Sequence, residues 1–373
     1  MQTKIFRILL TLGWLPYLTF CPALTASAQS DVQIRITQVD NSNFPNVTVY
    51  VSVTNSAGEP VGIDPATIQI SENGQLMPSI DIRGGGTGQA ESLTTMLVLD
   101  ISGSMDKNGK FSAAQDAAKT YVSQMRPGDQ AGLITFDTQV YHVQSVTTDI
   151  AALTNAIDGL RTGSDTAMFN ALREAEKELE GISGRKAIIA LTDGLDNQSH
   201  ATAEDVIAAI GPSGLTISTI GFGDASTASQ AGLDEAALRS LAERSGGLYS
   251  YAADSESLSA LYQQYGRTLQ SEYAITYVSP ASLRDGVNRN LSVSLSELGA
   301  STEAKYNPGG VLPEVGRSSW TLFGTIFAGL LLMLIIPFVI GRGAGLFAGL
   351  KPKGRIKLTQ PAPTGKKPNI RIK

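Results

Sequence analysis

The sequence predicts an α/β protein in which a doubly wound, mainly parallel sheet with helices on both faces is inserted in a small β-sandwich. Between residues 92 and 271, short apolar runs alternate with stretches of helical periodicity, which is typical of strands and helices that alternate along a chain. Strand patterns flank this segment on both sides. A long uncharged stretch near the C-terminus adds one predicted transmembrane helix.

The N-terminal residues 1–28 have the three parts of an export signal. Lys4 and Arg7 give a positive start, an apolar stretch follows, and the small-residue pattern "ASA" ends at Ala28. The two prolines inside the apolar stretch disfavour a first membrane helix. The only cysteine, Cys21, lies within this segment, so cleavage after Ala28 leaves a chain without disulfides or thiol chemistry. Such a chain is typical of a bacterial envelope protein.

Residues 29–91 and 272–310 are predicted to be the two parts of the β-sandwich. "NVTVYVSVTN" alternates valine with polar residues, and "ENG" supplies a hairpin turn. "YAITYV" and "LSVSL" repeat the strand pattern in the second part. Neither part has enough strands for a sandwich alone. Because the termini of an inserted domain usually lie close together, we expect the two parts to combine.

The segment 92–271 has the pattern of the α/β domain. Its apolar runs are "TTMLVLD", "QAGLITF", "RKAIIALTD", "LTISTIGFG" and "GLYSYA". Apolar residues between them recur at steps of three and four, which predicts amphipathic helices. The four groups with this spacing are Phe111 to Met125, Leu153 to Leu160, Leu172 to Leu179, and Leu238 to Leu241.

The C-terminal part is predicted to contain a linker (311–318), a transmembrane helix (319–341) and a basic tail (342–373). Ser318 to Gly341 is a run of 24 residues without a charge, which exceeds the length needed to cross a bilayer. The tail holds nine Lys and Arg and no acidic residue. The positive-inside rule therefore predicts a single-pass protein of the cell membrane with a cytoplasmic tail and extracytoplasmic N-terminal domains, in the periplasm or at the cell surface.

The charge distribution limits the partners. All 34 acidic residues lie between the signal and the predicted span, together with 18 Lys and Arg, which gives this region a net charge near −16. Such a surface disfavours nucleic acid. The basic, proline-containing tail is suited to anionic lipids or to a cytosolic partner.

Oxygen-bearing side chains follow two of the predicted strands. Asp100, Ser102 and Ser104 stand at alternate positions where "TTMLVLD" ends, so they point to the same side. Asp193 ends the later strand "RKAIIALTD". If these strands flank the reversal of strand order, both carboxylates face one crevice. Oxygen ligands without histidine or cysteine predict Mg²⁺, with Mn²⁺ or Ca²⁺ as alternatives.

At these residues the chain resembles the metal-ion-dependent adhesion site of von Willebrand factor A domains, in the form found in bacterial membrane-anchored members. The matching features are D-x-S-x-S after an apolar strand, Thr166 at the start of a helix, and a strand that ends in T-D-G. The resemblance implies that Ser102 and Ser104 bind the metal through hydroxyls and that Thr166 joins them directly when ligand is bound. It also implies that Asp100 and Asp193 act through water or through hydrogen bonds to the serines. It covers residues 92–270.

Nearby acids and histidines are not expected to take part. Asp165 and Asp196 are interpreted as solvated loop acids, either of which could hold a water of the metal. His142 and His200 are the only histidines, and the sequence contains no H-E-x-x-H and no G-x-S-x-G. "GSMDKNGK" has one residue too many between its glycines for a phosphate-binding loop. The sequence therefore predicts a protein that is not an enzyme.

The expected function is capture of a protein ligand through the divalent cation and an Asp or Glu of that ligand. A second hypothesis is an assembly or maturation factor for envelope complexes that uses the same site. A third is that the metal site regulates the shape of the protein through a helix shift.

Overall fold

The computed structural model describes residues 32–85, 92–211, 214–223, 232–296, 298–310 and 320–347. The predicted signal (1–28), the linker (311–318) and the tail beyond residue 347 lie outside the described residues. The chain divides into two compact units, Met1–Pro313 and Glu314–Lys373. All of the candidate site residues lie in the first unit.

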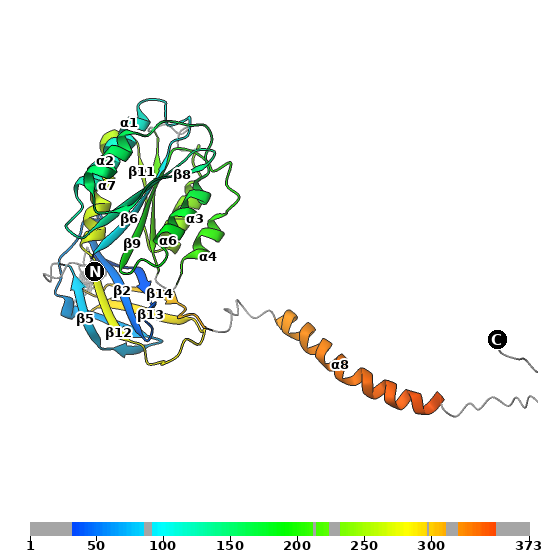
Figure 1. Ribbon diagram of the computed structural model, residues 1–373. Helices are drawn as coiled ribbons and strands as arrows, with labels where there is room; N and C mark the ends of the chain where they lie inside the picture. Colours follow the sequence, from blue (N-terminus) through cyan, green and yellow to red (C-terminus); the bar gives the residue numbers. More distant parts are fainter. Residues whose placement is uncertain are drawn as a thin grey trace, which may run out of the picture. The chain divides into compact units, whose positions relative to one another are not determined.

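A six-stranded sheet forms the centre of the α/β domain (Figure 1). Its strand order is β11-β10-β9-β6-β7-β8, and only the pairing of β7 with β8 is antiparallel. The prediction of an α/β fold with a mainly parallel sheet is confirmed. The strands are β6 (Leu93–Asp100), β7 (Gln130–Phe136), β8 (Val140–Thr147), β9 (Arg185–Thr192), β10 (Thr216–Phe222) and β11 (Tyr249–Ala252).

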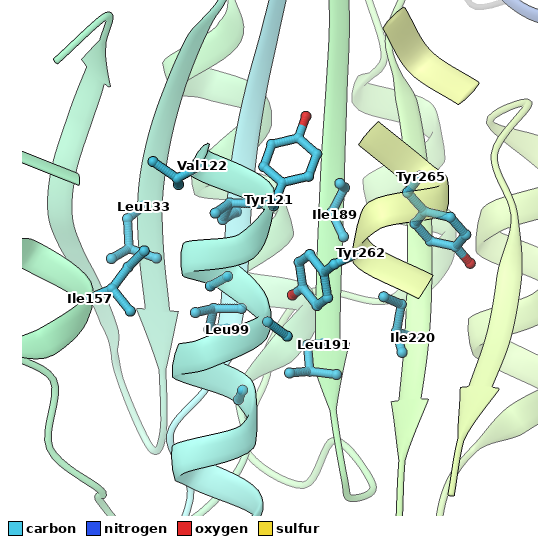
Figure 2. Close-up of a cluster of buried hydrophobic side chains, with 14 of the residues drawn as sticks. Leu99, Tyr121, Val122, Leu133, Ile157, Ile189, Leu191, Ile220, Tyr262 and Tyr265 are labelled. Carbon is cyan, nitrogen blue, oxygen red and sulfur yellow. The ribbon is translucent and has the colours of Figure 1, made fainter. Parts of the chain in front are cut away.

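Helices cover both faces of this sheet, because alternate side chains of each strand point to opposite faces. Leu97 and Leu99 of β6 pack in the cluster under α1, α2 and α7, whereas Met96 and Val98 pack in the cluster under α3, α4 and α6. Figure 2 shows the first cluster, with Tyr262 of α7 facing the strands. The helices are α1 (Lys110–Ser123), α2 (Ile150–Asp158), α3 (Met168–Leu179), α4 (Ala203–Ala209), α6 (Glu235–Arg244) and α7 (Ser255–Gln270).

The sequence pattern did not reveal β8, α4 and α7. β8 is an edge strand in which no residue is fully buried, so it lacks the apolar run that marks the central strands. α4 has only seven residues and one buried side chain. α7 buries tyrosine, threonine and glycine along with leucine, which weakens its apolar periodicity.

Two four-stranded sheets share a third hydrophobic cluster and form a β-sandwich. Both sheets combine strands from before and after the α/β segment, since β2 pairs with β12 and β3 pairs with β13. The first sheet contains β1 (Val32–Asp40), β2 (Asn46–Asn55), β12 (Tyr273–Val278) and β5 (Ser79–Gly84). The second contains β14 (Ser301–Tyr306), β13 (Arg289–Leu295), β3 (Ile68–Glu72) and β4 (Gln75–Met77).

The amino ends of the parallel strands rest on the sandwich. Arg185 at the start of β9 forms a buried ion pair with Glu272, which lies between α7 and β12. It also donates to Gln38 Oε1 of β1 at 2.9 Å. Thr216 at the start of β10 donates to the carbonyl of Thr37 at 2.6 Å. The sandwich therefore covers the amino ends of the strands, and their carboxyl ends point away from it.

The second unit contains helix α8 (Trp320–Phe347). In the part of the chain that the structure describes, no helix combines the length and the apolarity that a membrane crossing requires. The transmembrane helix predicted over 319–341 is therefore not supported by the structure.

Candidate metal centre

The candidate site lies where β6 and β9 end, at the reversal of strand order. β6 and β9 are parallel neighbours, and β7 lies on the other side of β6. In open α/β sheets this point forms a crevice outside the carboxyl ends of the strands. Asp100 is the last residue of β6 and Asp193 follows the last residue of β9. The two carboxylates therefore lie at the same edge of the sheet, at the carboxyl ends of neighbouring strands.

Asp100 is held by two hydrogen bonds inside the protein. Its side chain is almost completely buried, with the residue 1% exposed. The amide of Ser102 donates to Oδ1 at 2.7 Å, and the hydroxyl of Thr192 donates to Oδ2 at 2.6 Å. Burial raises the pKa of Asp100 to about 6, although the bonds from Ser102 and Thr192 oppose this shift, and the charge of Asp193 adds to it.

Ser102, Ser104 and Asp193 form one hydrogen-bonded chain. The hydroxyls of Ser102 and Ser104 lie 3.1 Å apart, and Ser104 donates to Asp193 Oδ1 at 2.5 Å. The other oxygen of Asp193, Oδ2, accepts from the ammonium of Lys110 at 2.7 Å. Three of the five predicted residues are thus linked directly, and Asp100 joins them through the backbone of Ser102.

Thr166 reaches the site through a loop that packs on the D-x-S-x-S segment. The amide of Gly103 donates to the carbonyl of Ser164 at 2.7 Å. A Cβ added at Gly103 would lie 3.3 Å from the carbonyl oxygen of Gly163, a tight contact that glycine avoids. The Thr166 hydroxyl lies beside the T-D-G turn, 3.6 Å from the position of a Cβ added at Gly194. The structure therefore brings all five predicted residues to one edge of the sheet.

The donor set fits a hard divalent cation. It consists of two buried carboxylates and three hydroxyls, which are the oxygen ligands that Mg²⁺, Mn²⁺ and Ca²⁺ accept. Within the described residues, no group of three or more His, Cys, Asp and Glu is arranged to hold a metal. A centre at this edge would therefore depend on the serine and threonine hydroxyls as much as on the carboxylates.

Three residues that contribute to the site were missed by sequence reasoning. Thr192 holds Asp100, Lys110 pairs with Asp193, and Asn197 accepts a hydrogen bond from the amide of Thr166 at 3.1 Å. The T-D-G motif contains Thr192, so it could have been included. The contact of Lys110 spans 83 residues of sequence, and no local pattern marks it.

The interpretation of Asp196 as a solvated loop acid is wrong. Asp196 is half-buried, and its Oδ2 accepts from the amide of Phe169 in the first turn of α3 at 2.8 Å. Its Oδ1 accepts from the amide of Ser199 at 2.9 Å. An acid at a helix start satisfies an amide that has no partner inside the helix. Asp165, by contrast, is exposed.

Part of the α/β domain matches a known family. Residues 95–195 match the family model of the von Willebrand factor type A domain. A UPF0353 protein of Nocardia farcinica is 27% identical over 258 residues, which cover 59% of this chain and 76% of that protein. Calcium-activated chloride channel regulator 1 of Equus caballus is 29% identical over 191 residues. That match covers 48% of this chain but only 19% of the horse protein.

Among solved structures, the von Willebrand factor type A protein of Catenulispora acidiphila has a TM-score of 0.44 and 17% identity, covering 74% of this chain and 72% of that one. Residues 95–195 are therefore part of a von Willebrand factor type A domain, and the chain is similar to a bacterial UPF0353 protein over 59% of its length.

Proposed function

We propose that this protein binds a protein partner through a divalent cation held by Asp100, Ser102, Ser104, Thr166 and Asp193. The observation that carries the proposal is the convergence of these five residues at the carboxyl ends of β6 and β9. Domains of this type generally serve adhesion and interaction rather than catalysis.

The charges at the site support a cation with a vacant position. Two buried carboxylates, Asp100 and Asp193, lie close enough for each charge to be felt by the other. Neutral hydroxyls supply the remaining ligands and leave a bound ion short of negative charge. Mg²⁺ prefers about six oxygens, so an Asp or Glu of the partner can complete its coordination sphere. The bound ion also offsets the repulsion between an acidic partner and the acidic region of this chain.

The test is chemical cross-linking of the full chain on intact cells, in Mg²⁺ and in EDTA. We expect a cross-linked partner in Mg²⁺ that is lost in EDTA and in the Ser102→Ala variant. Ser102→Ala is preferred to a change at Asp100, because it removes a hydroxyl without disturbing the bond from Thr192. Ser71→Ala in the sandwich is the matched control and should retain the partner.

The identity of the partner separates the two uses of the site. One stable complex of envelope subunits would favour an assembly or maturation factor, and a ligand on another cell or in a matrix would favour adhesion. In both cases, replacing the partner's contacting Asp or Glu by the amide should abolish capture. Capture that is unchanged in EDTA and in Ser102→Ala would contradict the proposal.

We also propose that the von Willebrand factor type A domain lies outside the cytoplasm. The support is the export signal predicted over 1–28 and the contrast between the acidic region and the basic tail. The membrane anchor and a lipid or cytosolic partner of the tail remain predictions from the sequence alone. Protease added to intact or osmotically opened cells should degrade the domain and spare the tail, whereas a fully protected domain would refute this location.

A further inference from the structure

Lys110 is the first residue of α1, and its side chain turns toward the candidate site. Its Nζ lies 2.7 Å from Asp193 Oδ2. The lysine side chain is 15% exposed and the Asp193 side chain is completely buried. The preceding residue, Gly109, has a left-handed backbone (φ 71°), which starts the helix in the direction that brings Lys110 to the aspartate.

The ammonium of Lys110 occupies a position where a divalent cation would also be attracted. Asp193 Oδ1 already accepts from Ser104, so Oδ2 is the oxygen that remains for a cation or for its bound water. Both oxygens of Asp100 accept hydrogen bonds within the protein. Lys110 thus compensates one of the two buried negative charges at this edge of the sheet.

We propose that Lys110 is a built-in counter-cation that holds Asp193 in the metal-free protein and must release Oδ2 when the divalent ion binds. The inference rests on the proposed function, because it concerns the affinity of the same site. Two like charges that share one carboxylate repel each other strongly in a buried environment. The lysine stem is long and flexible, and the side chain is partly exposed, so the ammonium can move to solvent. Lys110 therefore lowers the affinity of the site for the ion.

The proposal predicts the effect of Lys110→Met, which keeps a long apolar stem and removes the charge. Titration calorimetry with Mg²⁺ on the full chain should show binding about tenfold tighter, or more, than in the wild type. In EDTA the variant should melt at a lower temperature, because Asp193 is left buried without its cation. Mg²⁺ should restore the melting temperature, so the increase on adding Mg²⁺ is larger than in the wild type.

Lys107→Met is the matched control. Lys107 lies three residues earlier, in the loop before α1, and is exposed. Its substitution makes the same change in net charge and leaves the contact of Lys110 with Asp193 in place. It should change Mg²⁺ affinity by less than about twofold. Lys110→Arg tests the opposite direction and does not depend on the stability of the methionine variant. Its planar guanidinium can hold a carboxylate with two hydrogen bonds, so Mg²⁺ should bind more weakly than in the wild type.

The outcomes separate this inference from the proposed function. The role of Lys110 is overturned, and the metal site stands, if three results occur together. The wild type binds Mg²⁺, Asp193→Asn does not, and both Lys110→Met and Lys110→Arg bind it as the wild type does. Mg²⁺ binding by Lys110→Met with little binding by the wild type supports the inference in its strongest form. If neither the wild type nor any lysine variant binds Mg²⁺, both the proposed function and the inference fail.

Discussion

Two buried carboxylates of this protein, one in the β-sandwich and one in the α/β domain, have pKa values shifted in opposite directions. Glu72 at the end of β3 and Asp100 at the end of β6 are each only 1% exposed. The pKa of Glu72 lies below its ordinary value, whereas the pKa of Asp100 is raised to about 6. Equal solvent exposure therefore does not fix the direction in which the pKa of a carboxyl group shifts.

Glu72 is compensated within the sandwich. Burial by itself would raise its pKa, but four donors reverse the shift by stabilising the ionised form. One of them is the cation Arg289, which lies 3.0 Å from Glu72 and also pairs with the more exposed Asp285. The donors are the hydroxyls of Tyr277, Tyr306 and Ser279 and the guanidinium of Arg289, at 2.8 to 3.0 Å.

Asp100 has only neutral donors, Ser102 and Thr192, and the charge of Asp193 opposes its ionisation. The site contains the carboxylates of Asp100 and Asp193 and the cation Lys110, which pairs with Asp193. The difference indicates that the sandwich cluster completes a structure, whereas the strand-end cluster has a negative charge left over for an added cation. This comparison can be tested by removing or adding charge at each place.

The largest effect is expected for Glu72→Gln. The substitution breaks the buried ion pair of Glu72 with Arg289, which is 5% exposed and keeps the more exposed Asp285 as an acidic partner. Breaking a buried ion pair costs about 3 kcal/mol or more. Urea unfolding should show this loss in free energy of unfolding equally in Mg²⁺ and in EDTA. A loss below about 1 kcal/mol would mean that the sandwich cluster is not the balanced structure described here.

The second effect concerns the added cation. Mg²⁺ at a hundred times its dissociation constant should stabilise the wild type by about 2.7 kcal/mol. Ser104→Ala removes the hydroxyl that links Ser102 to Asp193, so most of this stabilisation should disappear. The stability in EDTA should fall by about 1 kcal/mol or more, because the buried Asp193 loses a donor. Thermal unfolding of the wild type and of Ser104→Ala, each in Mg²⁺ and in EDTA, measures this stabilisation. If Mg²⁺ stabilises Ser104→Ala as much as the wild type, the Ser104 hydroxyl does not take part in binding the cation.

The third effect is a gain in stability for Asp100→Asn in EDTA. Because the folded-state pKa is raised from 3.8 to about 6, the stability associated with this group is present below pH 4 and is lost as the pH rises through 6. The neutral amide avoids the loss, which amounts to roughly 3 kcal/mol at most for a shift of this size. The changed bond to Thr192 offsets part of the gain, so we expect about 1 kcal/mol at pH 7.5.

The same variant has a built-in control at low pH. At pH 4 the buried Asp100 is already protonated, so the wild type and Asp100→Asn should unfold at nearly the same urea concentration. Mg²⁺ should stabilise the wild type at pH 7.5 but not Asp100→Asn. A variant less stable than the wild type at pH 7.5 in EDTA would mean that the charge of Asp100 is already compensated.

The smallest effect separates the two acids beside the site. Asp196→Ala removes the acceptor at the start of α3 and should cost about 1 kcal/mol in urea unfolding. The Mg²⁺ response should persist, because Asp196 serves the helix. Asp165→Ala, at an exposed position, should stay within about 0.5 kcal/mol. If Mg²⁺ no longer stabilises one of these variants, the replaced acid is a part of the metal centre.

Much of the fold follows from local patterns. The central strands β6, β9 and β10 are buried on both sides and therefore read as continuous apolar runs. The alternating valines of β2 mark a sandwich strand in the same way. The edge strand β8 and the short helix α4 bury too little to leave such a pattern.

The candidate site, too, was predicted from the sequence only in part. The sequence by itself determined the types and spacing of its five oxygen-bearing residues, because D-x-S-x-S and T-D-G are short motifs whose geometry depends on neighbouring residues. Only the tertiary structure decided which charges meet. The contacts of Asp193 with Lys110 and of Asp100 with Thr192 join residues 83 and 92 positions apart, and the balance of charge depends on distance in space.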